Sequence, residues 1–497
     1  MRDEDFIPLN DVEFEDFLSE SISDLPPEDE TARSVNPWRR GMRAVLVGMA
    51  LNSVTLNFWG LDYILPTVGV LLMLLGFRAL RRVNRWFSAC YWITVLQTVL
   101  TLFTFSLNAT IWQESFYAGA WMPLLNLWAL VFPMFRCFAL WRGLREVRAR
   151  AGLEPGAKPA LMLLLWYILL ILCADLGVGL VAGLVIIGAY FLILRSLWKV
   201  SKELDEAGYL MEPAPVRLSD GALSAVVAVA LVVGIAGGWA LFHRYPMDWT
   251  EREAPALSAE AAEIRENLLE LGFPDYVLDD LTEEDILSCK GAERVELKCA
   301  VHPMNRGRVV EHDHYRTKVF DHKELQLTGV GVKLPGERDH WVLFHHFLWV
   351  EDVPFYGTES IQFWTTDHLE GWGVAGDFTG RVLYDKGNTT YTAPYWSLGM
   401  ESYTSDSMFF GQSEKQELFA AFSMPFRAEN ARGYVVYPVQ ERQDGWIIDS
   451  WMNYTHPTSP LQYPALTAMQ MRMKNGGDYA GVFVTAFDAI QFYPDQT

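Results

Sequence analysis

The segment GALSAVVAVALVVGIAGGWALFHRYPMDW, residues 221–249, joins two chemically different parts of this sequence. No charged residue lies between Asp220 and Arg244. That length of helix is enough to cross a bilayer core, where roughly 20 mostly apolar residues are needed. Every backbone polar group must then be bonded inside the segment, because no water reaches it. The segment therefore predicts a membrane helix that leads into a separate, aromatic-rich folded domain.

Six further apolar stretches precede this segment, so the sequence predicts seven spans. The predicted spans cover residues 42–59, 63–80, 87–107, 119–140, 159–174, 176–194 and 221–242. The stretch 159–194 is either a tight hairpin or a single long helix. Basic residues at both of its ends favour the hairpin, with its outer turn at Asp175.

The orientation follows from the positions of Lys and Arg, which accumulate in cytoplasmic loops. Basic residues occupy every second connection, at 39–43, 78–85, 142–158 and 195–202, whereas the connections at 60–62, 108–119 and 175 contain none. We therefore expect a multi-pass protein of the cell membrane, in contact with the lipid bilayer. Its N-terminus is predicted to be cytoplasmic and its C-terminal domain extracytoplasmic.

The net charge of −21 is distributed unevenly along the chain. Residues 1–34 hold 12 acidic and 2 basic residues, residues 35–242 hold 10 and 17, and residues 243–497 hold 39 and 21, which gives net charges of −10, +7 and −18. A strongly acidic exterior repels phosphate backbones, so nucleic acid is excluded as a partner. Cations, neutral ligands and basic peptides remain compatible with it.

Residues 1–38 form an acidic leader without the basic start and early apolar core of a cleavable signal peptide. One interpretation is a largely disordered tail, because carboxylates dominate its composition. The other is a short helix from about Asp11 to Ser21 that contacts a basic cytosolic protein.

The C-terminal domain begins with helical periodicity and continues with strand periodicity. Residues 250–292 predict a helical stalk, in which Thr282 and Asp285 fit a capping-box-like start signal. Residues 293–497 predict a β-rich domain, mostly an antiparallel β-sandwich or jelly-roll-like fold, so the whole domain is α+β. The expected strands are 295–301, 308–319, 325–333, 340–350, 360–365, 380–383, 417–423, 433–439, 446–452, 468–473 and 482–492.

Two aromatic-rich segments of this domain, TTYTAPYWSLG and DSWMNYTHPTSPLQYP, are predicted to be loops. They combine aromatic and polar side chains, as ligand-binding loops do. Most aromatic residues of a sandwich belong to its core, which is the alternative. The candidate ligand-binding residues are Tyr391, Tyr395, Trp396, Trp446, Trp451, Tyr454 and Tyr463.

A metal site has one weak candidate, and no cofactor is predicted. His312 and His314 would point to the same face of a strand, which is a geometry that a metal can use. The run is similar to the His-x-His of cupins, but a glutamate at short downstream spacing is missing. Solvent-facing or hydrogen-bonded histidines are the alternative.

Cys289 and Cys299 are the only cysteines predicted to be extracytoplasmic. They either form a disulfide, as an oxidising compartment permits, or remain two buried thiols. No GxSxG, HExxH, Walker A or CxxC pattern occurs in the sequence. The sequence therefore predicts no catalytic residues, and whether the protein is an enzyme stays open, with a function other than catalysis favoured.

Residues 35–87, VNPWRRGMRAVLVGMALNSVTLNFWGLDYILPTVGVLLMLLGFRALRRVNRWF, resemble the opening of uncharacterised bacterial multi-pass membrane proteins. Those proteins carry an acidic cytosolic leader and a large extracytoplasmic tail. The leader ISDLPPEDETARSVNPW is loosely similar in layout to membrane-anchored anti-sigma regulators, but it lacks their His and Cys zinc-binding pattern. The resemblance implies a regulatory role and names no activity.

The leading hypothesis is a bacterial membrane sensor or signalling regulator. Its extracytoplasmic domain would bind a small ligand, a glycan or another envelope component, and its leader would contact a cytosolic partner. The alternatives are an envelope enzyme or transport-associated protein that handles glycans or lipids, and a structural membrane scaffold.

Overall fold

The computed structural model describes residues 37–53, 61–173, 180–209, 211, 214–215, 217–253, 257–305, 307–312, 315–407, 411–475 and 482–494. The chain divides into two compact units. The helical unit comprises residues 1–106 and 114–235, and the sandwich unit comprises residues 107–113 and 236–497. Each unit is described by itself.

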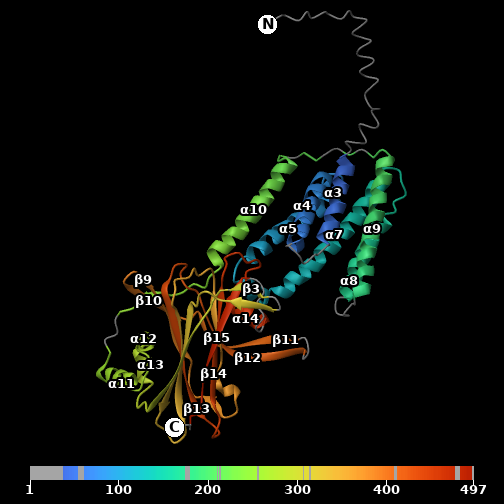
Figure 1. Cartoon of the computed structure of the whole chain (residues 1–497). Helices are drawn as coiled ribbons and strands as arrows, with labels where there is room; N and C mark the ends of the chain where they lie inside the picture. Colours follow the sequence, from blue (N-terminus) through green and yellow to red (C-terminus); the bar gives the residue numbers. More distant parts are fainter. Residues whose placement is uncertain are drawn as a thin grey trace, which may run out of the picture. The chain divides into compact units, whose positions relative to one another are not determined.

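The N-terminal part of the chain folds into helices (Figure 1). They are α3 (Pro37–Asn52), α4 (Leu61–Leu80), α5 (Arg85–Leu107), α6 (Gln113–Tyr117), α7 (Met122–Arg150), α8 (Lys158–Cys173), α9 (Leu180–Glu206) and α10 (Asp220–Phe242). Among the described residues, five helices are long and apolar enough to cross a membrane, namely α4, α5, α7, α9 and α10. A helical region compatible with the bilayer is therefore confirmed.

Seven spans are not shown, because two of the predicted ones correspond to shorter helices. Helices α3 and α8 have 16 residues each, fewer than the roughly 20 that a perpendicular span requires. The predicted span 42–59 also extends over residues 54–59, which lie outside the described part. Within 159–194 the structure has two helices, α8 and α9, and the indole of Trp166 on α8 donates to the Ile186 carbonyl oxygen of α9 at 2.9 Å. The predicted turn at Asp175 lies outside the described residues, so the hairpin stays a prediction.

Helices α3 and α4 approach each other closely through glycines spaced seven residues apart. Gly41 and Gly48 lie on α3, and Gly76 and Gly69 face them from α4. A Cβ atom at Gly48 would lie 2.5 Å from the carbonyl oxygen of Gly69. Small residues allow membrane helices to pack backbone against backbone, which is the favourable packing available where lipid is the solvent.

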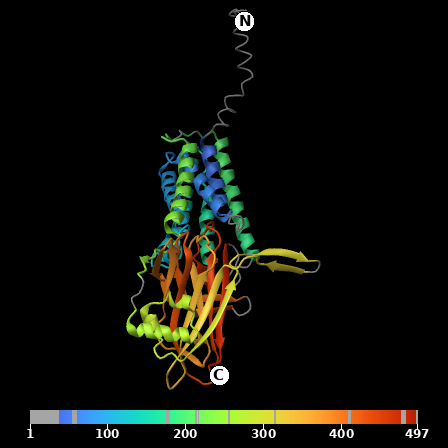
Figure 2. The same ribbon diagram turned by 60° about the vertical axis from the view of Figure 1, so that its left-hand side comes forward.

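The sandwich unit contains two large antiparallel sheets (Figures 1 and 2). The larger sheet has the order β1-β10-β9-β13-β6-β5-β2, with β8 also paired to β13, and the smaller has the order β11-β12-β7-β14-β15. The strands of the larger sheet are β1 (Thr250–Glu251), β2 (Arg294–His302), β5 (Leu325–Leu334), β6 (His340–Trp349), β8 (Trp372–Val374), β9 (Thr379–Lys386), β10 (Thr389–Pro394) and β13 (Glu429–Glu441). Those of the smaller sheet are β7 (Glu359–Trp364), β11 (Ser397–Ser407), β12 (Gly411–Phe422), β14 (Ile448–Pro457) and β15 (Phe483–Phe492).

The two sheets face each other across a core built by strand alternation. Successive side chains of a strand point to opposite faces, so Phe347 of β6 meets Phe422 of β12 while Phe344 faces away. The adjacent residues His345 and His346 separate in the same way. His345 lies between the sheets, and His346 lies on the outer face of the larger sheet.

Helices α11 (Ala259–Glu270), α12 (Asp275–Leu278) and α13 (Glu283–Leu287) cover that outer face. Their apolar side chains join Phe344 and Val436 in one buried cluster. Thr282 and Asp285 form the predicted capping box at the start of α13. The helices predicted at 250–292 therefore belong to the sandwich and do not form a separate stalk.

Two strand predictions and one loop prediction need correction. The stretch 308–319 is a hairpin of β3 (Arg308–His312) and β4 (Tyr315–Val319), which projects from the sandwich in Figure 2. The stretch 468–473 lies in α14 (Ala468–Asn475), because Thr467 and Gln470 form a capping box and Ala, Met and Gln favour a helix. The predicted aromatic loop at 389–399 is occupied by β10 and the start of β11.

Candidate functional site

The sandwich unit contains a junction formed by three separate segments, residues 107–113, 236–247 and 457–467. The first segment follows α5, the second is the end of α10 with the residues after it, and the third follows β14. All three belong to the same compact unit. The junction therefore joins the residues after α5, the end of α10 and the loop after β14 within one unit.

Backbone hydrogen bonds fasten these segments together. The amide of Ile111 donates to the carbonyl oxygen of Phe242 at 3.0 Å, and the amide of Ala465 donates to that of Asn108 at 2.8 Å. The buried side-chain amide of Gln113 donates to the carbonyl oxygen of Ala465. The ends of α5 and α10 are consequently parts of one hydrogen-bonded structure with the sandwich loops.

His243 and Arg244, which follow α10 directly, extend this structure. The His243 ring stacks on Trp239 at 4.5 Å, and its Nδ1 lies 2.5 Å from the Trp239 carbonyl oxygen. Arg244 donates from Nε to His243 Nε2 at 3.0 Å and from its terminal nitrogens to the carbonyl oxygens of Met424 and Phe355. Burial lowers the pKa of His243, the Trp239 oxygen opposes this, and the charge of Arg244 adds to the lowering. The two ring nitrogens of His243 therefore link the Trp239 carbonyl oxygen to Arg244.

A buried acid–base pair lies next to the junction, between the two sheets. His456 Nδ1 is 3.0 Å from both carboxylate oxygens of Glu359, and the two side chains are 5 % and 0 % exposed. The rings of Trp349 and Phe355 lie 4.8 Å and 5.7 Å from that of His456. Tyr454 also bonds Glu359, and burial raises the pKa of that carboxyl although His456 opposes the shift. The pair is a buried, titratable element beside the junction.

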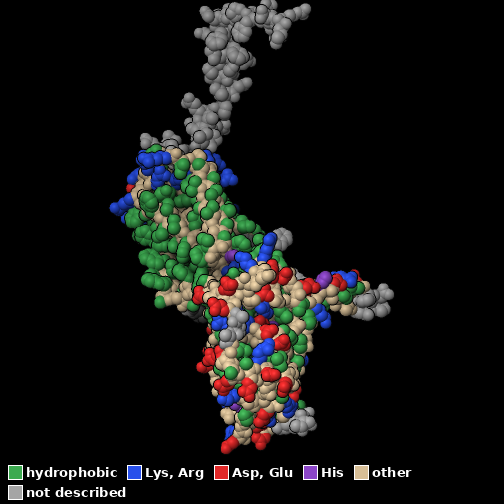
Figure 3. All heavy atoms as spheres, turned by 90° about the vertical axis from the view of Figure 1, so that its left-hand side faces the viewer, with side chains coloured by type: hydrophobic (Ala, Val, Ile, Leu, Met, Phe, Trp, Pro, Cys, Tyr) green, Lys and Arg blue, Asp and Glu red, His purple; other side chains and the backbone are tan. Residues whose placement is uncertain are grey.

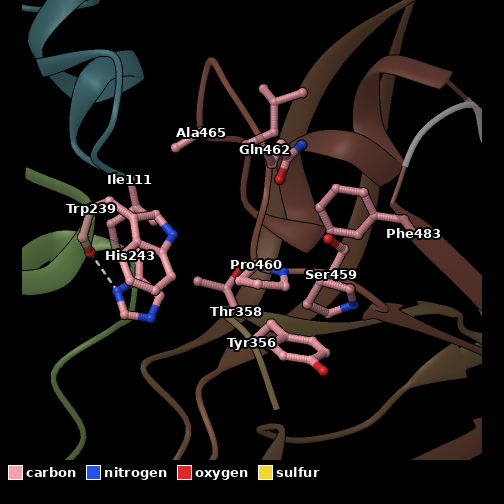
Figure 4. A pocket seen from close by; sticks show the side chains of 13 residues that line it. Ile111, Trp239, His243, Tyr356, Thr358, Ser459, Pro460, Gln462, Ala465 and Phe483 are labelled. Carbon is pink, nitrogen blue, oxygen red and sulfur yellow. Dashed lines mark hydrogen bonds between the residues drawn. The ribbon is translucent and has the colours of Figure 1, made fainter. Parts of the chain in front are cut away.

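A small pocket opens between these elements, as Figure 4 shows. Its lining residues are Ile111, Trp239, His243, Tyr356, Gly357, Thr358, Pro457, Ser459, Pro460, Gln462, Ala465, Leu466 and Phe483. The cavity volume is about 30 Å³, which holds about two water molecules. Pockets for organic ligands enclose several hundred Å³, so this one is a small gap in the junction and not a preformed ligand site.

The structure does not gather the seven predicted ligand-binding aromatics into one site. Tyr395 and Tyr454 are core residues of the sandwich, and Tyr391 stacks on Tyr384 at 5.3 Å within the larger sheet. Trp446 lies just before β14 and is 36 % exposed. These positions follow from strand alternation, because β10 and β14 occupy segments that we predicted as loops.

Two of the remaining aromatics lie at the junction. Trp396 is 44 % exposed, stacks on Tyr245 at 5.6 Å and approaches the Trp112 ring at 6.0 Å. Tyr463 lies in the loop 457–467 and is 36 % exposed. They add aromatic surface to the junction without forming an enclosed pocket.

Trp451 belongs to an exposed aromatic platform on the outer face of the smaller sheet. Its ring lies 6.1 Å from Trp364 of β7 and 6.1 Å from Phe487 of β15. Trp364 and Phe487 are 38 % and 59 % exposed. A row of aromatic faces on adjacent strands is a surface on which an apolar or ring-shaped ligand can stack.

A larger but shallow groove lies at a loop edge of the sandwich. Its volume is about 320 Å³, and its lining residues are Asp352, Val353, Pro354, Phe426, Arg427, Ala428 and Glu429. Both carboxylates are exposed, and each accepts a backbone N–H, Asp352 from Asn430 and Glu429 from Gly387. The groove therefore lacks the protected carboxyl environment that glycoside hydrolases use for their acid.

The metal candidate lies mostly outside the described residues. His314 is not described, and only the backbone of His312, at the end of β3, is described. Within the described ranges, no group of three or more His, Cys, Asp or Glu residues is arranged to hold a metal ion. The His312–His314 hypothesis remains a prediction.

Cys289 and Cys299 are free thiols in the structure, so the disulfide alternative is corrected. Cys289 is fully buried in the cluster beneath α11–α13. Cys299 is exposed on β2, where its sulfur lies 3.6 Å from the hydroxyl of Thr328. Residue spacing alone could not separate these two environments.

Sequence reasoning missed the buried charges of the sandwich. Glu359 shares an inward strand face with Ile361 and Phe363, so alternation in ESIQFW would have indicated a buried carboxylate. Its partner His456 lies 97 positions away. Only the pairing of β7 with β14 brings the two residues together, and a single sequence gives no signal for that pairing.

Comparisons with known proteins assign no family to this chain. No family model matches the sequence, and no curated protein matches it. A solved structure of a pore-forming protein is similar at 8 % identity and a TM-score of 0.16, covering 33 % of this chain and 79 % of that one. AvmM, which catalyses macrocyclization in alchivemycin A biosynthesis, is similar at 12 % identity and a TM-score of 0.16, covering 38 % and 98 %. Likenesses of this size carry no functional argument.

Proposed function

We propose that this protein is an integral membrane sensor or regulator. In this proposal the helices cross the cell membrane seven times. The five long apolar helices and the two shorter helices α3 and α8 are the seven spans. The N-terminus is cytoplasmic and the sandwich is extracytoplasmic. The distribution of Lys and Arg along the sequence supports this orientation, because cytoplasmic connections carry the basic excess.

The observation that supports signal transmission most strongly is the hydrogen-bonded junction. The chain passes between the two compact units at residues 106/107, 113/114 and 235/236, so three covalent connections lead from the sandwich unit into apolar helices. Hydrogen bonds of Ile111, Gln113 and Ala465 hold the segments at these connections in one structure. A change in the sandwich that moved the junction would therefore move the ends of α5 and α10 together, as a transmitting device requires.

The aromatic platform of Trp364, Trp451 and Phe487 is the proposed contact for the extracytoplasmic ligand or envelope component. Its exposed rings offer apolar faces at low conformational cost. The acidic leader, residues 1–38, is proposed to contact a basic cytosolic protein. Residues 1–36 lie outside the described part, so support for that contact comes from the leader's charge of −10 over residues 1–34.

Orientation is testable with the natural cysteine Cys299, which is exposed on the sandwich. A membrane-impermeant maleimide applied to intact cells is expected to label the full chain, and Cys299→Ser is expected to remove the label. Labelling that requires permeabilised cells would place the sandwich in the cytoplasm and contradict the proposed topology.

Signalling is testable through the leader and the junction in the same cells. A photo-crosslinker within residues 1–38 of the full chain is expected to capture a specific basic protein. Gln113→Leu, which breaks a junction hydrogen bond, is expected to change that capture by at least threefold. The matched exposed substitution Gln443→Leu is expected to leave it unchanged.

Each failure has a distinct meaning. If the leader captures no specific protein, the signalling half of the proposal is wrong. If capture occurs but Gln113→Leu leaves it unaltered, the helices anchor the sandwich without transmitting.

A further inference from the structure

A second hollow, unrelated to the junction, lies in the helical unit between α3 and α9. Its cavity volume is about 120 Å³, and its lining residues are Arg39, Arg43, Trp198, Ser201, Lys202, Asp205 and Glu206. The walls are fixed to each other, because the fully buried Trp38 donates from its indole to the Ser201 carbonyl oxygen at 3.4 Å. The groove is therefore a built feature of the helix pair.

The groove has an excess of positive charge, which two arginines provide. Lys202 pairs with Glu206 at 3.1 Å along α9. Within the described part of the chain, Arg39 and Arg43 form no ion pair. With Asp205 included, three cations face two carboxylates, so the lining has a net charge of +1. An anion entering the groove would meet arginine, whose planar fork binds phosphate oxygens in a bidentate manner.

The surroundings indicate that such an anion is part of a lipid. The same helix α9 exposes apolar side chains along its preceding turns, including Val185 and Leu192, which are 67 % and 64 % exposed. Trp198 is 40 % exposed at the level of the groove, and such amphipathic rings prefer the membrane–water interface. Figure 3 shows Lys and Arg gathered at one end of the helical unit's apolar surface.

We propose that this groove binds the phosphate headgroup of an anionic phospholipid. The acyl chains would lie along the apolar face of α9, and the headgroup phosphate would be held by Arg39 and Arg43. Basic hollows between membrane helices at the cytoplasmic surface recognise lipid headgroups by this combination of charge and apolar contact. The proposal is independent of the sensor function, because it concerns the helical unit alone.

The test uses the full chain in neutral detergent, with thermal unfolding and native mass spectrometry as readouts. Phosphatidylglycerol is expected to raise Tm and to give a resolved one-lipid adduct, whereas phosphatidylcholine and inorganic phosphate are expected to do neither. Arg39→Gln with Arg43→Gln is expected to weaken phosphatidylglycerol binding by about 30-fold, equivalent to about 1 kcal/mol for each basic residue.

The matched control removes two charges at the same end but outside the groove, with Arg82→Gln and Lys199→Gln. Both residues are exposed, and neither lines the hollow. This variant is expected to bind phosphatidylglycerol within about threefold of the original chain. Arg39→Lys with Arg43→Lys keeps the charge, so its expected intermediate loss separates headgroup recognition from misfolding.

Three results would overturn the proposal. An equal loss in the control variant would mean that diffuse charge attracts the lipid. A Tm rise with inorganic phosphate alone would identify a soluble anion as the ligand. Phosphatidylglycerol binding that appears only after deletion of residues 1–34 would show that the acidic leader occupies the groove in the full chain.

Discussion

The helical unit and the sandwich both bury charged side chains, but they accommodate them differently. Arg136 on α7 is 1 % exposed, its guanidinium bonds the neutral side chain of Gln97, and its Nε has no partner among the described residues. Asp280 in the sandwich is 3 % exposed and accepts from His346 Nε2 at 2.9 Å and Arg432 Nε at 2.8 Å. The carboxylate of Asp280 is thus compensated by two donors, whereas the guanidinium of Arg136 bonds a neutral side chain and keeps one nitrogen unbonded in the described part of the chain.

The surfaces of the two units differ in the corresponding way. Only 6 % of the most apolar 18 residues of α10 is buried. Because these residues are apolar and exposed, the helix presents an almost wholly apolar surface. The sandwich instead displays many carboxylates among polar side chains (Figure 3). The contrast indicates two solvents, lipid around the helices and water around the sandwich. Each prediction below tests the helical unit or the sandwich against this difference.

The largest expected effect comes from breaking the Asp280 network. Burial by itself raises the pKa of Asp280, but the hydrogen bonds and charges of His346 and Arg432 hold the pKa below its ordinary value. Asp280→Ala leaves two buried groups without their carboxylate, so we expect a loss of about 3–5 kcal/mol in the free energy of unfolding. Thermal and urea unfolding of the full chain, monitored by tryptophan fluorescence, measures this loss.

The neighbouring residue provides the control. Asp279 bonds Arg265 at 2.7 Å, but its side chain is 64 % exposed. Asp279→Ala removes an exposed ion pair, whose contribution is about 0–1 kcal/mol. Equal losses for the two variants would show that burial of Asp280 does not determine its importance.

Two valines with nearly equal exposure test the difference in solvent directly. Val229 on α10 is 60 % exposed and Val309 on β3 is 58 % exposed. Val229→Arg places a charge near the middle of a proposed span, so we expect a penalty of about 3 kcal/mol and a large loss of membrane-integrated protein. Val309→Arg faces water and is expected to change integration and stability by less than about 0.5 kcal/mol.

Membrane fractionation after alkaline extraction gives the readout for both valine variants. Unchanged integration of the Val229→Arg protein would contradict the assignment of α10 to the bilayer. A strong effect of Val309→Arg would instead indicate that the β3–β4 hairpin contacts an apolar surface.

The packing of the helical unit is tested at its glycines. Gly48→Ala places a methyl group 2.5 Å from the Gly69 carbonyl oxygen, so α3 and α4 must separate, at an expected cost of about 2–3 kcal/mol. A Cβ atom at Gly188 on α9 would meet no described atom within 4 Å, so Gly188→Ala is expected to be neutral or stabilising by up to about 1 kcal/mol. Thermal unfolding in detergent compares the two, and an equal response would exclude close α3–α4 packing.

The sequence predicted the features that depend on local pattern. The uncharged run before Arg244 predicted α10, and the Val, Phe and Trp content of HWVLFHHFLWV predicted β6. The metal and disulfide hypotheses rested on spacing within one segment. Spacing does not show that Cys289 faces the helix-covered core while Cys299 is exposed on β2.

The candidate site depended on long-range pairing and was therefore not predictable. Gln113 meets Ala465 across 352 positions, and Glu359 meets His456 across 97. Both contacts result from strand order and chain crossing, which no local period encodes. The prediction of two aromatic loops was wrong for another reason. Residues such as Tyr391 and Tyr454 are as common in a half-buried strand as in a binding loop, and here they lie on β10 and β14.

The smallest expected effect is the acid sensitivity of the sandwich core. His345 is 2 % exposed, bonds Ser450 at 2.7 Å, and has its pKa lowered to about 3 by burial, although Asp488 opposes the shift. Because its pKa is lower in the folded state than the unfolded value of 6.5, its contribution is present above pH 6.5 and is lost as the pH falls toward 3. Between pH 7 and pH 5 this loss amounts to about 2 kcal/mol.

His345→Gln is expected to reduce the difference in unfolding free energy between these pH values by that amount, whereas His322→Gln at an exposed site is expected to retain it. If the His345 variant shows the same difference in unfolding free energy between pH 7 and pH 5, protonation of other groups causes the acid destabilisation.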